Sequence, residues 1–155
     1  MKTTITETQL TEVIPLSNFI RSVYDDSVAP HYSEQGNAEF YKYIDTNAVT
    51  DHLQNNHWML KAELNKELVG IIEIRDNNHV SMLFVSSIHQ RQGIGKQLLA
   101  AAIEKIHELI PSQQKISVHS SPNSTVAYEK LGFVAISDEK EVNGIRFTTM
   151  EKTIR

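Results

Sequence analysis

Residues 81–96 read SMLFVSSIHQRQGIGK and predict a strand, a glycine-containing turn and the start of a helix. The apolar run 82–85 has strand length and residues that suit a pleated sheet. Amide N–H groups at a helix start lack partners within the helix and, with the helix dipole, favour an anion. Glycine lets such a ligand approach the backbone closely. After the turn, apolar residues recur at helical spacing: Leu98, Leu99, Ala102, Ile103, Ile106 and Ile110. The stretch therefore predicts a turn that binds a phosphate group.

Two common phosphate-binding motifs do not fit this turn. A dinucleotide fingerprint, G-x-G-x-x-G, would need a third glycine where Leu98 stands. A Walker A loop needs Ser or Thr after its lysine, but Gln97 follows Lys96. Residues 90–95, QRQGIG, instead resemble the Q/R-x-x-G-x-G/A signature of the GNAT (GCN5-related N-acetyltransferase) superfamily. The strand before the match and the amphipathic helix after it make this resemblance specific.

Size and composition predict one globular domain over residues 1–155. A formal net charge of −4 argues against a nucleic-acid partner, which needs clustered Lys and Arg. The sequence has no cysteine, which excludes disulfides, thiolate metal sites and a cysteine nucleophile. It shows neither an apolar signal region near residue 1 nor an apolar run approaching 18 residues. We therefore expect a cytoplasmic protein without a membrane partner.

The order of predicted elements also resembles the GNAT fold. That resemblance implies an α/β (α+β) domain with a mixed, mostly antiparallel sheet of about seven strands and about four flanking helices. Its fourth and fifth strands splay apart, and the fourth leads into the glycine turn. In the first part of the chain we expect an edge strand within residues 4–13, a helix from about residue 14 and a helical zone at 38–55 that is interrupted near Asp45. Strands are predicted at 58–64, 68–75, 79–85 and 115–119. A helix from Ser121-Pro122 to Leu131 and closing strands after Phe133 and at 144–151 complete the chain.

A second segment, Tyr128-Glu129-Lys130-Leu131-Gly132-Phe133, is similar to the family's Y-x-x-x-G-F motif. The resemblance implies an acetyltransferase (an acyltransferase) that uses acetyl-CoA as co-substrate and acetylates a primary amine. It implies that Tyr128 is the general acid that protonates the leaving coenzyme A thiolate. Many family members carry Asn where this chain has Ser121, so either Ser121 or Asn123 could bond the pantetheine arm. The residues that match the family's coenzyme-binding positions are Phe84, Val85, Gln90, Arg91, Gln92, Gly93, Ile94, Gly95, Lys96, Ser121 and Asn123.

The residue that takes the proton from the amine is left open by the sequence. Glu73 alternates with Ile72 and Ile74 and so points to the other face of its strand. His119 ends the parallel strand where the splay is expected, and His79 begins the strand of the turn. Each has a structural alternative: a solvated sheet face for Glu73, a capping residue for His119 and a turn residue for His79. A chain of water molecules with no single base is an equal alternative.

The other histidines show no metal-ligand spacing, so no metal site is predicted. A serine hydrolase is excluded because the chain has no G-x-S-x-G elbow. Two alternatives stay open: a non-catalytic acetyl-CoA sensor on the same fold, and an acyltransferase with another acyl-CoA or acceptor. Aromatic residues within 24–58 would flank the acceptor, which could be a small molecule, a peptide or a protein. A homodimer is common in the family, but no segment identifies an interface.

Overall fold

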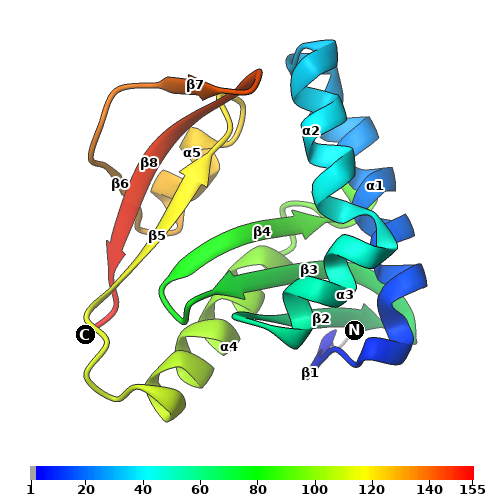
Figure 1. The fold of residues 1–155 in the computed structure, drawn as a ribbon. Coiled ribbons are helices and arrows are strands. Elements are labelled where there is room, and N and C mark those ends of the chain that lie inside the picture. The colour runs from blue at the N-terminus through cyan, green and yellow to red at the C-terminus, as the bar shows by residue number, and fades with distance from the viewer. Residues whose placement is uncertain (1–2) are drawn as a thin grey trace.

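The computed structural model describes residues 3–155 and contains one mixed sheet with helices packed on both faces (Figure 1). The strand order is β1-β2-β3-β4-β5-β8-β6, and β7 pairs with β8. All pairs are antiparallel except β4 with β5. This confirms the expected fold, with eight strands and five α-helices where the sequence indicated about seven and about four.

The first third of the chain provides an edge strand and the helices of one face. β1 (Thr3–Glu7) pairs with β2, and a 3-10 turn at Leu10–Glu12 leads into α1 (Val13–Ser27). After a second 3-10 turn at Ala29–His31 come α2 (Glu34–Ile44) and α3 (Thr46–Gln54). Asp45 has extended backbone angles, and its carboxylate accepts a 2.8 Å hydrogen bond from the Ala48 amide. The predicted interruption near Asp45 is thereby confirmed.

Three consecutive antiparallel strands form the centre of the sheet: β2 (His57–Leu64), β3 (Glu67–Arg75) and β4 (His79–Val85). Asn65 and Lys66 close the first hairpin with φ angles of 53° and 67°. Such a two-residue turn matches the twist of the strands, and here it forms without glycine. The alternation along β3 places Ile72 and Ile74 in one apolar core with α4, and Ile71 in a second core with α1 and α3.

The splay lies between β4 and β5 (Lys115–Ser120), which are joined by α4 (Ile94–Leu109). These two parallel strands pair only at His79 with Ser117 and at Val80 with Val118. Beyond these pairs the strands diverge, so β4 runs on with a strand partner on one edge only. α4 covers the lower part of the sheet in Figure 1 and buries Leu98, Ala102 and Ile106 against it.

The last part of the chain forms a second, smaller group of elements beside the splay. It consists of α5 (Thr125–Lys130), β6 (Val134–Ala135), β7 (Lys140–Val142) and β8 (Ile145–Thr153). The predicted helix start at Ser121-Pro122 is wrong, because residues 121–124 form a turn closed by the Ser124 amide on the Ser121 carbonyl, 2.9 Å. The hairpin of β7 and β8 is an addition to the prediction. Within residues 3–155, no helix combines the length and apolarity needed to cross a bilayer.

Candidate active site

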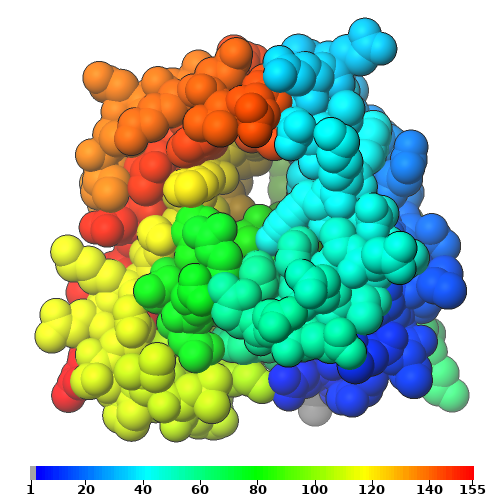
Figure 2. Space-filling model, viewed as in Figure 1, coloured from blue at the N-terminus to red at the C-terminus, as the bar shows by residue number. Residues whose placement is uncertain are grey.

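A cavity of about 420 Å³ lies where β4 and β5 diverge. It is lined by residues of α1, α2, β4 and β5, by the loop and helix at residues 121–128, and by the β7–β8 hairpin. Figure 2 shows the opening between the hairpin, in orange, and α2, in cyan. The splay of the sheet therefore creates a passage that is walled by two groups of elements far apart in the sequence.

The glycine turn precedes α4 and lies beside the end of β4. Gly93 is the N-cap of α4 and has a φ of 82°, a left-handed conformation that L-residues rarely adopt. A Cβ at Gly93 would meet no atom within 4 Å, and one at Gly95 would meet only a Val85 methyl at 3.9 Å. Ile94 is buried and anchors the helix. The backbone of the turn is thus open to a ligand.

Charge and hydrogen bonding in the turn fit a phosphate-bearing group. Arg91, Gln92 and Lys96 are exposed, and amides in the first turn of an α-helix have no acceptor within the helix. Gln90 acts differently from its neighbours, because its side-chain amide donates to the Val85 carbonyl at 3.1 Å and ties the turn to β4. The predicted residues Phe84 and Val85 are both half-buried at the end of β4, and Phe84 lines the cavity.

Tyr128 enters the cavity from α5, on the other side of the splay. α5 ends at Lys130, and Gly132, with a φ of 97°, lets the chain reverse after the helix so that the Phe133 amide donates to the Tyr128 carbonyl at 3.0 Å. The two rings then meet edge to face, 5.5 Å apart. Burial raises the pKa of Tyr128 above its ordinary value. The phenol is therefore protonated at neutral pH and can donate a proton.

The two residues predicted as alternatives for the pantetheine arm have separate positions. Ser121 lines the cavity, and its hydroxyl oxygen lies 2.8 Å from both Asn123 Oδ1 and Ser124 Oγ. Asn123 is exposed, and its side-chain amide donates to the Ser27 carbonyl at the end of α1, 3.0 Å away. The geometry thus places Ser121 at the cavity and uses Asn123 to join the α5 loop to α1.

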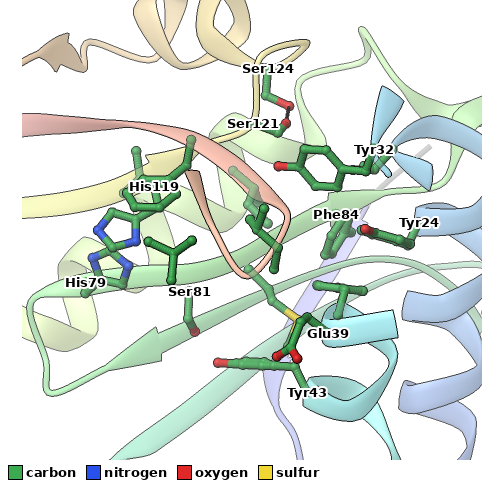
Figure 3. A pocket seen from close by; sticks show the side chains of 18 of the residues that line it. Tyr24, Tyr32, Glu39, Tyr43, His79, Ser81, Phe84, His119, Ser121 and Ser124 are labelled. Atoms are coloured by element: carbon green, nitrogen blue, oxygen red, sulfur yellow. Dashed lines mark hydrogen bonds between the residues drawn. The ribbon is translucent and has the colours of Figure 1, made fainter. Parts of the chain in front are cut away.

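The two histidine candidates for the base lie together where β4 and β5 part (Figure 3). His119 stacks on Phe147 at 4.5 Å and meets the His79 ring edge to face at 4.6 Å. His79 is buried, and its Nδ1 lies 2.7 Å from Ser117 Oγ. Desolvation lowers the pKa of His119, and burial lowers that of His79 to about 4. Both imidazoles are neutral at neutral pH and can accept a proton.

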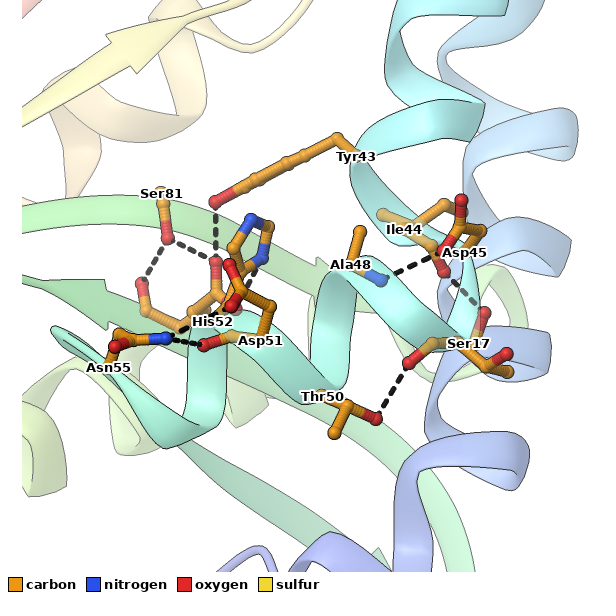
Figure 4. Close-up of polar contacts among 12 residues, drawn as sticks. Ser17, Tyr43, Ile44, Asp45, Ala48, Thr50, Asp51, His52, Asn55 and Ser81 are labelled. Carbon is orange, nitrogen blue, oxygen red and sulfur yellow. Dashed lines mark hydrogen bonds and ion pairs between the residues drawn. The ribbon is translucent and has the colours of Figure 1, made fainter.

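Glu73, the third candidate base, does not line the cavity. It is fully buried on the sheet face that carries α1 and α3, so the alternative of a solvated face is wrong. Two residues of the cavity wall, Tyr43 and Ser81, donate to Glu73 Oε1 at 2.7 and 2.6 Å (Figure 4). The carboxylate is therefore connected to the cavity through two hydroxyl groups.

One wall of the cavity, the aromatic wall, is formed mainly by residues of α1 and α2, within the region 24–58 for which the sequence predicted an acceptor site. Tyr24 and Phe40 stack at 3.9 Å, and Phe40 meets Phe84 edge to face at 5.9 Å. Tyr32 and Tyr43 extend the wall. Trp58, also expected to flank the acceptor, packs against the α4 core, and its indole N–H donates to Asn77 at 2.7 Å.

Several cavity residues were not singled out by the sequence. Glu39 on α2 contributes a carboxylate, half-exposed beside the aromatic wall, and no motif marks it. The β7–β8 hairpin contributes a further part of the wall. Its signal was present: Asn143 and Gly144, with φ angles of 52° and 81°, are the Asn-Gly pair that is typical of a two-residue hairpin.

Comparison with known proteins identifies the family. The acetyltransferase (GNAT) domain family matches residues 28–154. The PaiA N-acetyltransferase of Thermoplasma acidophilum, solved with coenzyme A, has a TM-score of 0.81 at 19% identity, over 99% of both chains. A GCN5-related N-acetyltransferase of Rhodopseudomonas palustris has 0.77 at 21% identity, over 99% of this chain and 96% of that one. An aminoglycoside 6'-acetyltransferase type Ii has 0.70 at 20% identity, over 98% and 97%.

The structural likeness establishes the shared fold, and no significant match was found among curated proteins. The family assignment rests on the sequence match, which begins at the end of α1 and runs through β8. It spans the glycine turn, the splayed strands and the helix of Tyr128. The chain therefore belongs to the GNAT family of acetyltransferases.

Proposed function

We propose that the protein transfers the acetyl group of acetyl-CoA to a primary amine by direct attack on the thioester. The observation that carries this proposal is the position of Tyr128, a protonated phenol in the same cavity as the aromatic wall of α1 and α2. A proton donor for a thiolate and a pocket for an amine thus share one space at the splay. A single-displacement reaction needs both groups within reach of the thioester.

The residues of this chain fit acetyl-CoA at two places. The open backbone at Gly93 and Gly95, with the exposed side chains of Arg91 and Lys96, suits the pyrophosphate. The free edge of β4 near Phe84 and Val85 offers backbone N–H groups that can polarise a carbonyl oxygen. When bound, acetyl-CoA supplies an acyl group activated as a thioester. Ser121 is the side chain that we assign to the pantetheine arm, since it lines the cavity.

In the reaction the amine nitrogen bonds to the thioester carbonyl carbon, and the carbon–sulfur bond breaks. Tyr128 Oη gives its proton to the departing thiolate. The proton that the amine loses needs an acceptor, and we assign it to His119, directly or through water. His119 lines the cavity with a lowered pKa, whereas Glu73 is separated from the cavity by Tyr43 and Ser81.

As the acceptor site, the aromatic wall favours an amine that arrives as a cation. Four aromatic rings and the Glu39 carboxylate face this part of the cavity. Aromatic faces and a carboxylate both attract an ammonium group. The ammonium group would lose one proton to bulk water before attack, and His119 would take the second proton, which the nitrogen releases as it bonds to the carbonyl carbon.

The test is a calorimetric titration with acetyl-CoA, followed by thiol release with a panel of amines, among them linear diamines, an aminoglycoside and a lysine peptide. We expect saturable one-to-one binding and turnover with at least one small cationic amine. Binding without turnover on every amine would favour the sensor alternative. Absence of acetyl-CoA binding would reject the proposal as a whole.

A further inference from the structure

Three polar side chains from different elements meet where α3 packs on the sheet, behind the aromatic wall. They are His52 of α3, His57 at the start of β2 and Glu73 of β3. One ligand atom of each lies within 4.8 Å of the others. His52 Nδ1 is 3.9 Å from Glu73 Oε2, and the two imidazole rings stack at 4.5 Å. The separation of His52 and His57 from Glu73 in the chain explains why the sequence showed no metal spacing.

Three polar atoms of this cluster, one on each side chain, have no hydrogen-bond partner within residues 3–155. Glu73 is fully buried, and its Oε2 has no hydrogen-bond donor. The Nδ1 atoms of His52 and His57 are also buried without a hydrogen-bond partner. Buried polar atoms are almost always paired, and an orphaned one calls for a water or an ion. Three such atoms on three neighbouring side chains call for a common ligand.

We propose that His52, His57 and Glu73 bind one divalent transition-metal ion of the zinc type. Two imidazoles and a carboxylate form a donor set that suits Zn²⁺ and disfavours Ca²⁺ and Mg²⁺, which prefer oxygen ligands alone. Tetrahedral zinc with bonds of about 2.0–2.1 Å places ligand atoms about 3.4 Å apart. The 3.9 Å between His52 Nδ1 and Glu73 Oε2 therefore needs only a small side-chain rotation.

The surroundings support this site. One nearby charge, that of Arg75, repels positive charge at His57. Arg75 is also paired with Asp76 at 3.8 Å, which offsets part of this repulsion. The other oxygen of Glu73 already accepts from Tyr43 and Ser81, which fixes the carboxylate in the way that outer ligand partners do in metal sites. Because its ligands come from α3, β2 and β3, the ion would join the helical layer to the sheet. Since Tyr43 also lines the acceptor cavity, the site lies one side chain behind that wall.

The experiment titrates ZnSO₄ into tag-free, EDTA-treated and dialysed protein by calorimetry, with CaCl₂ and MgCl₂ in parallel. We expect one Zn²⁺ per chain at micromolar or tighter affinity, and no saturable heat with the other two ions. His52→Ala, His57→Ala and Glu73→Gln should each weaken zinc binding about tenfold or more. The matched control is His107→Ala on α4, whose imidazole has a hydrogen-bond partner, the Gln113 carbonyl. It should bind zinc as the wild type does.

Thermal unfolding gives a second readout, because an ion that binds only the folded chain raises the melting temperature. Zinc should raise the melting temperature of the wild type and of His107→Ala, and raise that of His52→Ala by less at the same zinc concentration. Glu73→Gln could fail to fold, so far-UV circular dichroism must accompany it, and His52, which is only partly buried, provides the decisive variant. No saturable zinc binding, or equal binding by wild type and His52→Ala, would overturn the proposal and leave a water-filled cluster.

Discussion

The two sides of the cavity, to which we assign the coenzyme and the acceptor amine, are built on different principles. On the coenzyme side, the glycine turn exposes backbone, and its Arg91 and Gln92 side chains extend into solvent. On the acceptor side, the wall consists of side chains: stacked Tyr24 and Phe40, and the carboxylate of Glu39. A backbone site needs particular conformations, which restrict the residues that can form it. A side-chain site can be built from many residues. The difference explains why the sequence contains a motif for the first side and none for the second.

The largest expected effect tests Tyr128, the side chain to which we assign proton transfer to the thiolate. Tyr128→Phe removes the phenol and keeps the ring that contacts Phe133 edge to face. We expect acetyl-CoA binding to be retained and kcat to fall by about two to four orders of magnitude, because general acid catalysis contributes that much. The measurements are calorimetric binding and thiol release on the best amine from the panel. An unchanged kcat would remove Tyr128 from the mechanism while leaving the coenzyme site intact.

The next effect concerns the short pairing of β4 with β5, which is the boundary between the two sides. Burial lowers the pKa of His79 to about 4, from 6.5 when solvated. Between these pH values the unfolded chain binds a proton that the folded chain does not. The unfolding free energy is therefore highest above about pH 6.5. It falls as the pH drops towards 4, by a total of about 3 kcal/mol.

Urea unfolding at pH 7.5, 6 and 5 measures this slope. His79→Asn can keep the contact with Ser117 Oγ but has no group that titrates in this range. We expect its unfolding free energy to change less with pH than that of the wild type. Parallel pH profiles for the two proteins would show that other groups cause the acid sensitivity.

The two glycines of the turn provide a smaller and more selective test of the backbone side. Gly93→Ala forces an L-residue to a φ of 82° and should cost about 1–2 kcal/mol of stability. If the turn relaxes to relieve this strain, acetyl-CoA binding should weaken about tenfold or more. In the comparison variant, Gly95→Ala, the residue lies within α4 without a left-handed φ, and the signature Q/R-x-x-G-x-G/A accepts alanine there, so affinity should fall less than in Gly93→Ala. Calorimetry on both variants decides, and equal effects would contradict a role for backbone conformation.

The parts of the fold that the sequence predicted well are those specified by local patterns. The helix break at Asp45, the boundary between the strands at 58–64 and 68–75, and the glycine turn each depend on a few adjacent residues. The start of α5 was misplaced because hydrogen bonds among Ser121, Asn123 and Ser124 hold a turn in place of the first helical turn. A proline after serine does not reveal such a network.

The candidate site was less predictable because it depends on contacts between distant segments. Alternation placed Glu73 on the correct face of its strand, but only the fold shows that this face is buried beneath a helical layer. The same applies to its hydrogen bond with Tyr43, thirty positions earlier. Glu39 lines the cavity because α2 packs near the β7–β8 hairpin. The sequence analysis did not predict this hairpin, although its Asn-Gly pair is typical of a hairpin turn.

The smallest expected effect isolates the acceptor side. Glu39→Gln removes a charge from the cavity while preserving size, and the native carboxylate has a weak, exposed partner, Lys42 at 3.6 Å. We expect the KM of a cationic amine to rise about two- to fivefold, as the loss of one half-exposed charge allows, with acetyl-CoA affinity and kcat unchanged. The rise should shrink at high salt, because exposed charges are screened.

Glu34→Gln is the matched control, since Glu34 lies on the same helix, is exposed and does not line the cavity. Steady-state kinetics at low and high ionic strength compare the two variants. An effect confined to Glu39 would show that the acceptor wall recognises charge through one side chain. Equal effects of both variants would mean that the amine responds to the overall field of α2, and that the recognition of the ammonium depends on the aromatic rings.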